Sequence, residues 1–185
     1  MEKGAASLGF PTLYINFLIH FHGDRDYFEC HEVLEEHWKN CGMHRNSIWV
    51  GLIQVAVSFY HYRRGNKKGA VKMMDKAVHL LTYKQQETET LGINHQHLIT
   101  KLKNSRLQMM NNMPYMAINL PINNRELLNL CVEQCVKLGY EWGDIDDHTS
   151  QSIIHKHKMR DRSDVVAERK FALEAKSRER KLLLA

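Results

Sequence analysis

The sequence of 185 residues is poor in the residues that break helices, and it has no long apolar run. It contains three prolines and ten glycines, too few for the frequent turns of a β-sandwich. It has no apolar stretch of the roughly eighteen residues that a transmembrane helix needs. It also does not open on a charged, then apolar, then small-residue leader. We therefore expect a soluble protein of the cytosol (cytoplasmic localisation) with no membrane partner.

Cysteine is scarce as well. The four cysteines are Cys30, Cys41, Cys131 and Cys135, and they form no C-x-x-C pair of the kind found in redox motifs and zinc sites. Cys131 and Cys135 are four residues apart, as two positions on one helix face would be. The cysteines are expected to be reduced thiols in the core.

Charge is ordinary in amount and uneven in distribution. The chain is 43% apolar and 25% charged, with a formal net charge of +5, which excludes wholesale disorder. Residues 155–185 hold ten Lys/Arg and five Asp/Glu, whereas the remaining residues hold sixteen of each. A protein that binds nucleic acid across its main surface would have a basic body. Nucleic-acid binding, through residues 155–181, is therefore the least favoured function.

The apolar residues recur with helical period throughout, with no convincing alternation of the strand type. The fold class predicted is all-α, a bundle of about six to seven helices with a peripheral basic C-terminal helix. The expected helices cover 12–22, 25–40, 46–64 and 67–84, then a fifth from Asn94, a sixth ending before Gly139, and a last one from Ser163 to Arg180. The expected division is a core at 1–84, additional helices at 85–145 and a basic tail at 146–185.

Local signals set the expected ends of these helices. Asp24, Asn66 and Asn94 are expected N-caps, and Gly65 is expected to end the third helix in the left-handed conformation. The third helix is apolar on nearly every side and should be the most buried. Its apolar surplus fits burial within a monomer or in a homo-oligomer, and composition does not separate the two.

The informative segment for function is the second helix. His31, Glu35 and Trp38 stand at i, i+4 and i+7, and therefore on one face. Cys30 and Leu34 share this face, so it is expected to point inward. On the third helix, Gln54 and His61 are seven residues apart and also share a face. Together these residues predict a buried polar seam of His31, Glu35, Gln54 and His61, covered by Trp38.

Two readings of this seam stay open. As a site, it would bind a small ligand or a divalent metal through His31, Glu35 and His61, with Glu35 and His31 as catalytic groups and Trp38, Gln54 and His61 as ligand contacts. As a structural network, it would only fix the packing of two helices in a structural or adaptor protein. The zincin pattern H-E-x-x-H is absent, because Glu35 follows where the second His should be, and so is the paired E-x-x-H of di-iron bundles. Whether the protein is an enzyme stays undecided.

Several of these residues match a known family in fixed order. The segment H-x-x-x-E-x-x-W at His31, Glu35 and Trp38, followed by G-L-I-Q-x-A from Gly51 and H-x-x-x-G-N from His61 to Asn66, resembles the bacterial and archaeal family called domain of unknown function 309. The similarity covers about residues 14–84. The resemblance implies an all-helical fold and assigns the motif to His31, Glu35 and Trp38, but it implies no established activity.

Overall fold

The computed structural model describes residues 9–145 and 150–155. The chain divides into two compact units, 1–154 and 155–185. The predicted helix from Ser163 to Arg180 lies outside the described residues, as does the basic tail except for residues 150–155. The expected division of the first unit at residue 84 stays a prediction.

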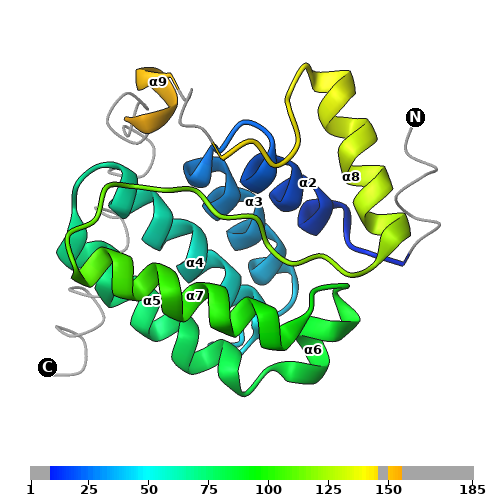
Figure 1. Ribbon diagram of the computed structural model, residues 1–185. Helices are drawn as coiled ribbons and strands as arrows, with labels where there is room; N and C mark the ends of the chain where they lie inside the picture. Colours follow the sequence, from blue (N-terminus) through cyan, green and yellow to red (C-terminus); the bar gives the residue numbers. More distant parts are fainter. Residues whose placement is uncertain (1–8, 146–149, 156–185) are drawn as a thin grey trace, which may run out of the picture. The chain divides into compact units, whose positions relative to one another are not determined.

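The described part of the chain is all-α, as the periodicity predicts (Figure 1). Its helices are α2 (Thr12–His22), α3 (Tyr27–Asn40), α4 (Ile48–Arg63), α5 (Lys67–Thr82), α6 (Gln85–Thr90), α7 (His95–Met110), α8 (Arg125–Leu138) and α9 (Gln151–Ile154). Among the described residues there is no β-strand, and an isolated antiparallel bridge joins Ile93 to Ile122. No helix in the described ranges has the length and apolarity that crossing a bilayer would require.

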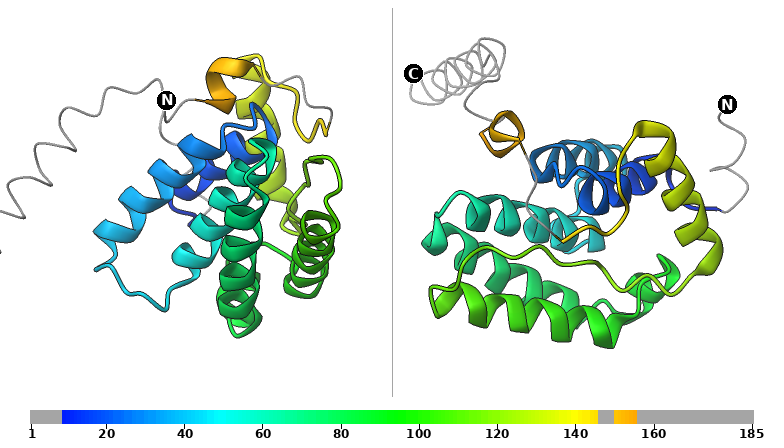
Figure 2. Two further views of the ribbon diagram at one scale, coloured as in Figure 1. Left: turned by 90° about the vertical axis from the view of Figure 1, so that its left-hand side faces the viewer. Right: turned by 45° about the horizontal axis from the view of Figure 1, so that its top comes forward.

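The central helix is α4, which packs against α3 on one side and α5 on the other (Figure 2). Ten of its sixteen residues are buried, the largest number in any described helix, although α2 buries a similar share, seven of eleven. The Ser58 hydroxyl donates to the carbonyl of Ala70 at 2.7 Å, and Gly51 lies against Leu81 at the other end of the pair. These two contacts show that α4 and α5 run antiparallel, as their short connection predicts.

Most of the helix ends predicted from local capping signals are confirmed. The Asn66 side chain accepts from the backbone N–H of Gly69 at 3.0 Å, and Asn94 accepts from that of His97 at 2.9 Å. Gly65 has φ of +73°, the left-handed conformation that ends α4. The prediction of Asp24 as the cap of α3 is wrong, because Asp26 accepts from the Glu29 N–H at 2.9 Å.

Two elements after α5 differ from expectation. The polar stretch at 85–92 forms the short helix α6, which the apolar period could not reveal because only Thr88 in it is buried. Residues 111–124, which belong to none of the expected helices, form an extended segment that packs on the helices. Ala117 and Leu120 are buried, and the Tyr62 hydroxyl donates to the carbonyl of Pro114 at 2.7 Å. This segment is a strap across the bundle (Figure 1).

The thiols are free, and three of the four are buried. Cys30, Cys131 and Cys135 lie in the core, whereas Cys41 is exposed at the end of α3. The expectation of core thiols is therefore wrong for Cys41. Burial raises the pKa of Cys131 to about 12, so this thiol stays protonated and behaves as a small apolar side chain.

Candidate functional site

The candidate site lies on α3, whose start is fixed by a tight turn. The Asp24 carboxylate accepts from the N–H of Asp26 at 3.1 Å, and Asp26 then caps the helix. Arg25 between them has φ of +55°. From this start the helix presents His31, Glu32 and Glu35 beside one another, because residues at i and i+4 share a face and i+1 lies next to it.

The His31 imidazole lies between two carboxylates. Its Nδ1 is 3.0 Å from Oε1 of Glu32, and its Nε2 is 3.3 Å from Oε2 of Glu35. The second oxygen of Glu35 is 3.0 Å from the Nζ of Lys39. The side chains of His31, Glu32 and Glu35 are 28%, 31% and 33% exposed. The expectation of a buried seam is therefore wrong for this part: Leu34 and Cys30 fill the core, and the charged groups lie at its edge.

This geometry leaves one nitrogen–carboxylate pair without a proton when the imidazole is neutral. A neutral imidazole has a single N–H and can donate to only one of the two carboxylates. The other nitrogen then faces a carboxylate lone pair to lone pair, so a metal cation between them would be favourable. One ligand atom each from His31, Glu32 and Glu35 lies within 4.8 Å of the others, a spacing that lets one cation contact all three.

His61 does not join this group. It is absent from the set of described residues whose ligand atoms lie together, and its Nδ1 accepts from the Asn66 amide at 3.1 Å. Burial, followed by the charge of Arg64, lowers the pKa of His61. A row of neighbouring rings leads from His31 through Phe28 and Tyr60 to His61. Phe28 and Tyr60 thus stand between the two histidines along this row.

Gln54 and Trp38 are the other two predicted contacts of the seam, and their roles stay predictions. The Oε1 atom of Gln54 is buried and accepts no hydrogen bond from the described part of the chain. An acceptor in this state is costly to keep, which suits a ligand contact. The indole Nε1–H of Trp38 donates to the carbonyl of His44 at 2.9 Å. Trp38 therefore holds the loop after α3, and the structure does not show it as a lid.

Glu32 is the member of the cluster that sequence reasoning missed. Glu32 entered the sequence analysis only as the Glu of H-E-x-x-H, a zincin pattern that Glu35 excludes. The available signal was its adjacency to His31, since neighbours on a helix do not usually face each other but a long Glu side chain can reach the preceding imidazole.

Two further buried polar residues, at the end of α2 and just before α3, were also missed. His22 is 1% exposed, and its ring lies between the carbonyl of Leu18 at 2.8 Å and the N–H of Leu120 at 2.9 Å. Burial lowers the pKa of His22 to about 3, so the ring is neutral, donating from Nδ1 and accepting at Nε2. Arg25 is 4% exposed and binds the strap and the segment after α8. Both residues bond to the strap, about a hundred residues further along the chain, and so they tie it to the end of α2 and the turn before α3.

Comparison with known proteins agrees with this motif. Residues 14–73 match the model of a domain of unknown function (DUF309). The chain is 38% identical over 172 residues to an uncharacterised protein, YpuF, of Bacillus subtilis (strain 168), and the alignment covers 92% of this chain and 99% of that protein. No solved structure matches significantly. Since the relative is similar over nearly its whole length and the family model covers α3 with its His31, Glu35 and Trp38, the chain belongs to the family of domain of unknown function DUF309.

Proposed function

We propose that this protein binds a divalent cation through His31, Glu32 and Glu35. The observation that supports the proposal is the position of one imidazole between two carboxylates, with ligand atoms from all three residues within 4.8 Å. One nitrogen and two oxygen ligands suit a transition metal such as Mn²⁺ or Zn²⁺ better than Ca²⁺, which prefers an all-oxygen shell.

In this proposal, the cation replaces the contact between Glu35 and Lys39. That ion pair spans one helical turn, and Lys39 is 57% exposed, so little free energy is lost when Lys39 moves away. A site with three protein ligands at the protein surface leaves coordination positions for water or a small ligand. Hydrolytic chemistry would use a water at these positions while His31 and Glu35 serve as ligands; without the cation, the same chemistry would use Glu35 as base and His31 as proton carrier. Gln54, His61 and Trp38 remain proposed ligand contacts.

The test is the binding of Mn²⁺ and Zn²⁺ to the full chain, by isothermal titration calorimetry and by the shift in melting temperature. We expect binding with one cation per chain, and stabilisation of about 2.7 kcal/mol when the free cation is at about a hundred times its dissociation constant. Glu35→Gln and Glu32→Gln should each weaken binding by about tenfold or more. Glu36→Gln is the matched control, because Glu36 is an exposed neighbour on α3 outside the cluster. The proposal is wrong if wild type and Glu35→Gln respond equally.

The second candidate function is a structural or adaptor role, and one observation favours it. Glu35 already joins His31 and Lys39 in a single network along α3, which can serve helix stability alone. The free energy of unfolding of Glu35→Gln after chelation separates the two roles. A loss of about 1 kcal/mol or more would indicate a structural network. Equal or higher stability would mean that the fold does not need the carboxylate, which favours a binding site.

A cytosolic location belongs to this proposal as well. Its support is the set of free thiols, of which Cys41 is exposed, since free thiols persist in a reducing compartment.

A further inference from the structure

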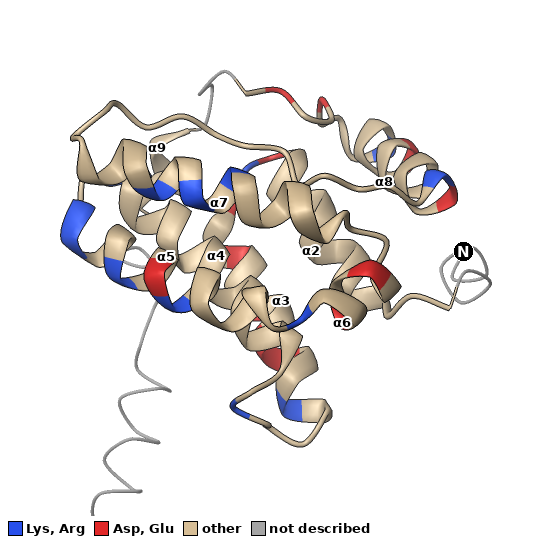
Figure 3. Cartoon of the chain, turned by 60° about the horizontal axis from the view of Figure 1, so that its bottom comes forward, with Lys and Arg blue, Asp and Glu red and all other residues tan. Residues whose placement is uncertain are grey.

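The first unit, residues 1–154, has a formal net charge of zero, but its positive and negative residues are concentrated on different helices. The helices α5 and α7 together hold seven Lys/Arg and a single acid, Asp75. In contrast, α3 holds four glutamates and one lysine. Figure 3 shows the basic residues gathered along α5 and α7. A surface of one sign on an otherwise neutral body is a feature that steers and selects a partner of opposite charge.

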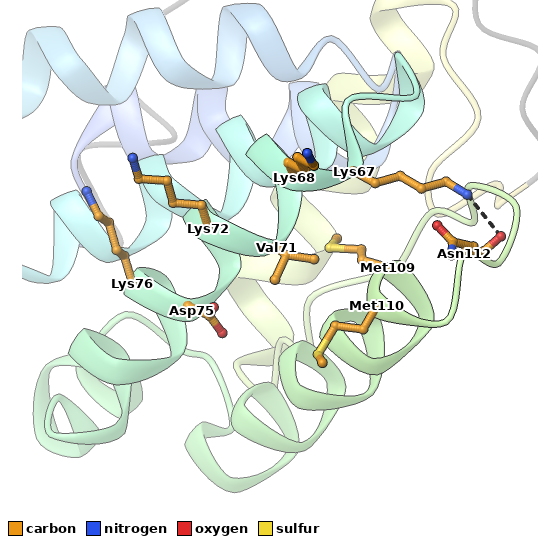
Figure 4. A pocket seen from close by; sticks show the side chains of 9 residues that line it. All are labelled: Lys67, Lys68, Val71, Lys72, Asp75, Lys76, Met109, Met110 and Asn112. Atoms are coloured by element: carbon orange, nitrogen blue, oxygen red, sulfur yellow. Dashed lines mark hydrogen bonds between the residues drawn. The ribbon is translucent and has the colours of Figure 1, made fainter.

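Three of these lysines form a row that the described residues leave without acidic partners. Lys68, Lys72 and Lys76 are exposed and stand at i, i+4 and i+8, hence on one face of α5. The one acid nearby, Asp75, is bound by Arg106 of α7, and Lys67 donates to the carbonyl of Asn112 at 3.0 Å. Figure 4 shows Lys72 and Lys76 extending to the same side of α5.

Beside this row lies a groove with an apolar floor. The cavity between α5 and α7 has a volume of about 600 Å³, and Val71, Met109 and Met110 lie between the basic residues that line it. Met110 is 50% exposed, and Met113, just after α7, is 51% exposed. Unbranched methionine side chains adapt to the shape of a partner and are common at surfaces that bind amphipathic helices.

We propose that the groove between α5 and α7 docks an acidic amphipathic helix of a partner protein. Apolar side chains of that helix would enter between Val71 and Met110, and its carboxylates would pair with Lys68, Lys72 and Lys76, whose spacing of one helical turn matches acids at i and i+4 on the partner. The proposal is independent of the cation site on α3.

The lining of the groove favours an acidic helix over a nucleic acid and over the chain's own C-terminal segment. No aromatic side chain of the described residues lines it, so they offer no platform on which bases could stack, and Arg106 nearby is already bound to Asp75. A sugar–phosphate backbone would also gain nothing from the methionine floor. The chain's own residues 155–185 carry ten basic and five acidic residues, so they lack the net negative charge that a row of lysines attracts.

The first experiment is a display selection on the full chain, with a library of random peptides of about the length of α5, sixteen residues. The variant Lys68→Glu/Lys72→Glu/Lys76→Glu is the counter-target. We expect enriched peptides with Asp or Glu on one side and Leu, Met or Phe at helical spacing on the other. Failure to enrich any peptide, or enrichment that is equal on the counter-target, overturns the proposal.

The second experiment measures the affinity of the best peptide by fluorescence anisotropy. The triple lysine variant should weaken binding by about tenfold or more, and Met110→Ser by about threefold. The control Arg125→Glu/Lys137→Glu places charge reversals on exposed positions of α8 and should change affinity by less than about twofold. Circular dichroism establishes that each variant is folded. If a dT oligonucleotide binds more tightly than the peptide, depends on the three lysines and ignores Met110→Ser, the groove is a nucleic-acid site and the proposal is wrong.

Discussion

Arg25 holds together three segments that are distant in the sequence. Its side chain is 4% exposed, and its guanidinium makes five hydrogen bonds, to the carbonyls of Phe21, Ile118 and Asp144 (the last twice) and to the Asn119 side chain. These bonds are 2.6–3.0 Å long. The strap and the segment after α8 are therefore tied to the turn that precedes α3.

Arg25→Lys keeps the charge and removes the planar set of donors. A lysine ammonium has three N–H groups at a single point, so at least two of the five bonds are lost. A hydrogen bond to a charged group contributes about 1.5–3 kcal/mol, and acceptors left in a water-poor site add to the loss. We expect Arg25→Lys to lower the free energy of unfolding by about 3–5 kcal/mol, a large share of the about 5–15 kcal/mol typical of a domain.

Urea denaturation followed by circular dichroism measures this loss, with Arg45→Lys, at an exposed loop position, as the control. Hydrogen exchange supplies a local reading. The amides of Leu120 and Gly143, which bond to Nε2 and the carbonyl of His22, should exchange faster in Arg25→Lys. A loss of stability under about 1 kcal/mol with unchanged exchange at both amides would refute this account of Arg25.

Two other predictions concern the packing behind the candidate site. Because the pKa of His22 is about 3 when folded and about 6.5 when unfolded, its contribution to stability is complete above about pH 6.5 and is lost as pH falls toward 3. At pH 5 the loss is about 2 kcal/mol, and His22→Gln should remove this pH dependence in urea titrations at pH 7.5 and 5; an identical dependence in the variant would contradict the assignment. Gly51→Ala should lower the free energy of unfolding by about 1–2 kcal/mol, because its Cβ would lie 2.5 Å from a Leu81 methyl. The double variant with Leu81→Ala should lose less stability than the sum of the two single variants, and purely additive losses would exclude the clash.

Helix positions could be predicted where their signals are local. Asn66 and Asn94 cap the helices that follow them, since a capping side chain bonds to an N–H only three residues away. The cap of α3 was misplaced by two residues because Arg25 adopts φ of +55°. That conformation is unfavourable by itself, and the guanidinium contacts with the strap compensate for it. No window of sequence around residue 25 contains those partners.

In the candidate site, too, contacts within one helix could be predicted and contacts between helices could not. His31 and Glu35 are brought to 3.3 Å by the period of a single helix, which the sequence contains. Whether Gln54 and His61 meet them depends on the register between α3 and α4, and His61 instead bonds to Asn66. The exposure of the cluster depends on the same packing, since a face that also carries Leu34 can still have its charged residues at the rim.

The helical class, most helix ends and the spacing of His31 and Glu35 follow from the sequence alone, because each rests on interactions within one helix or one turn. The family follows from the ordered motif between His31 and Asn66. The packing of the helices makes residues 111–124 a strap, buries His22 and Arg25, and places the lysines of α5 beside an apolar groove next to α7. These features arise between residues far apart in the chain. They depend on how the helices cross and pack. The hydrophobic period shows which face of each helix is apolar, but not how two helices are aligned against each other.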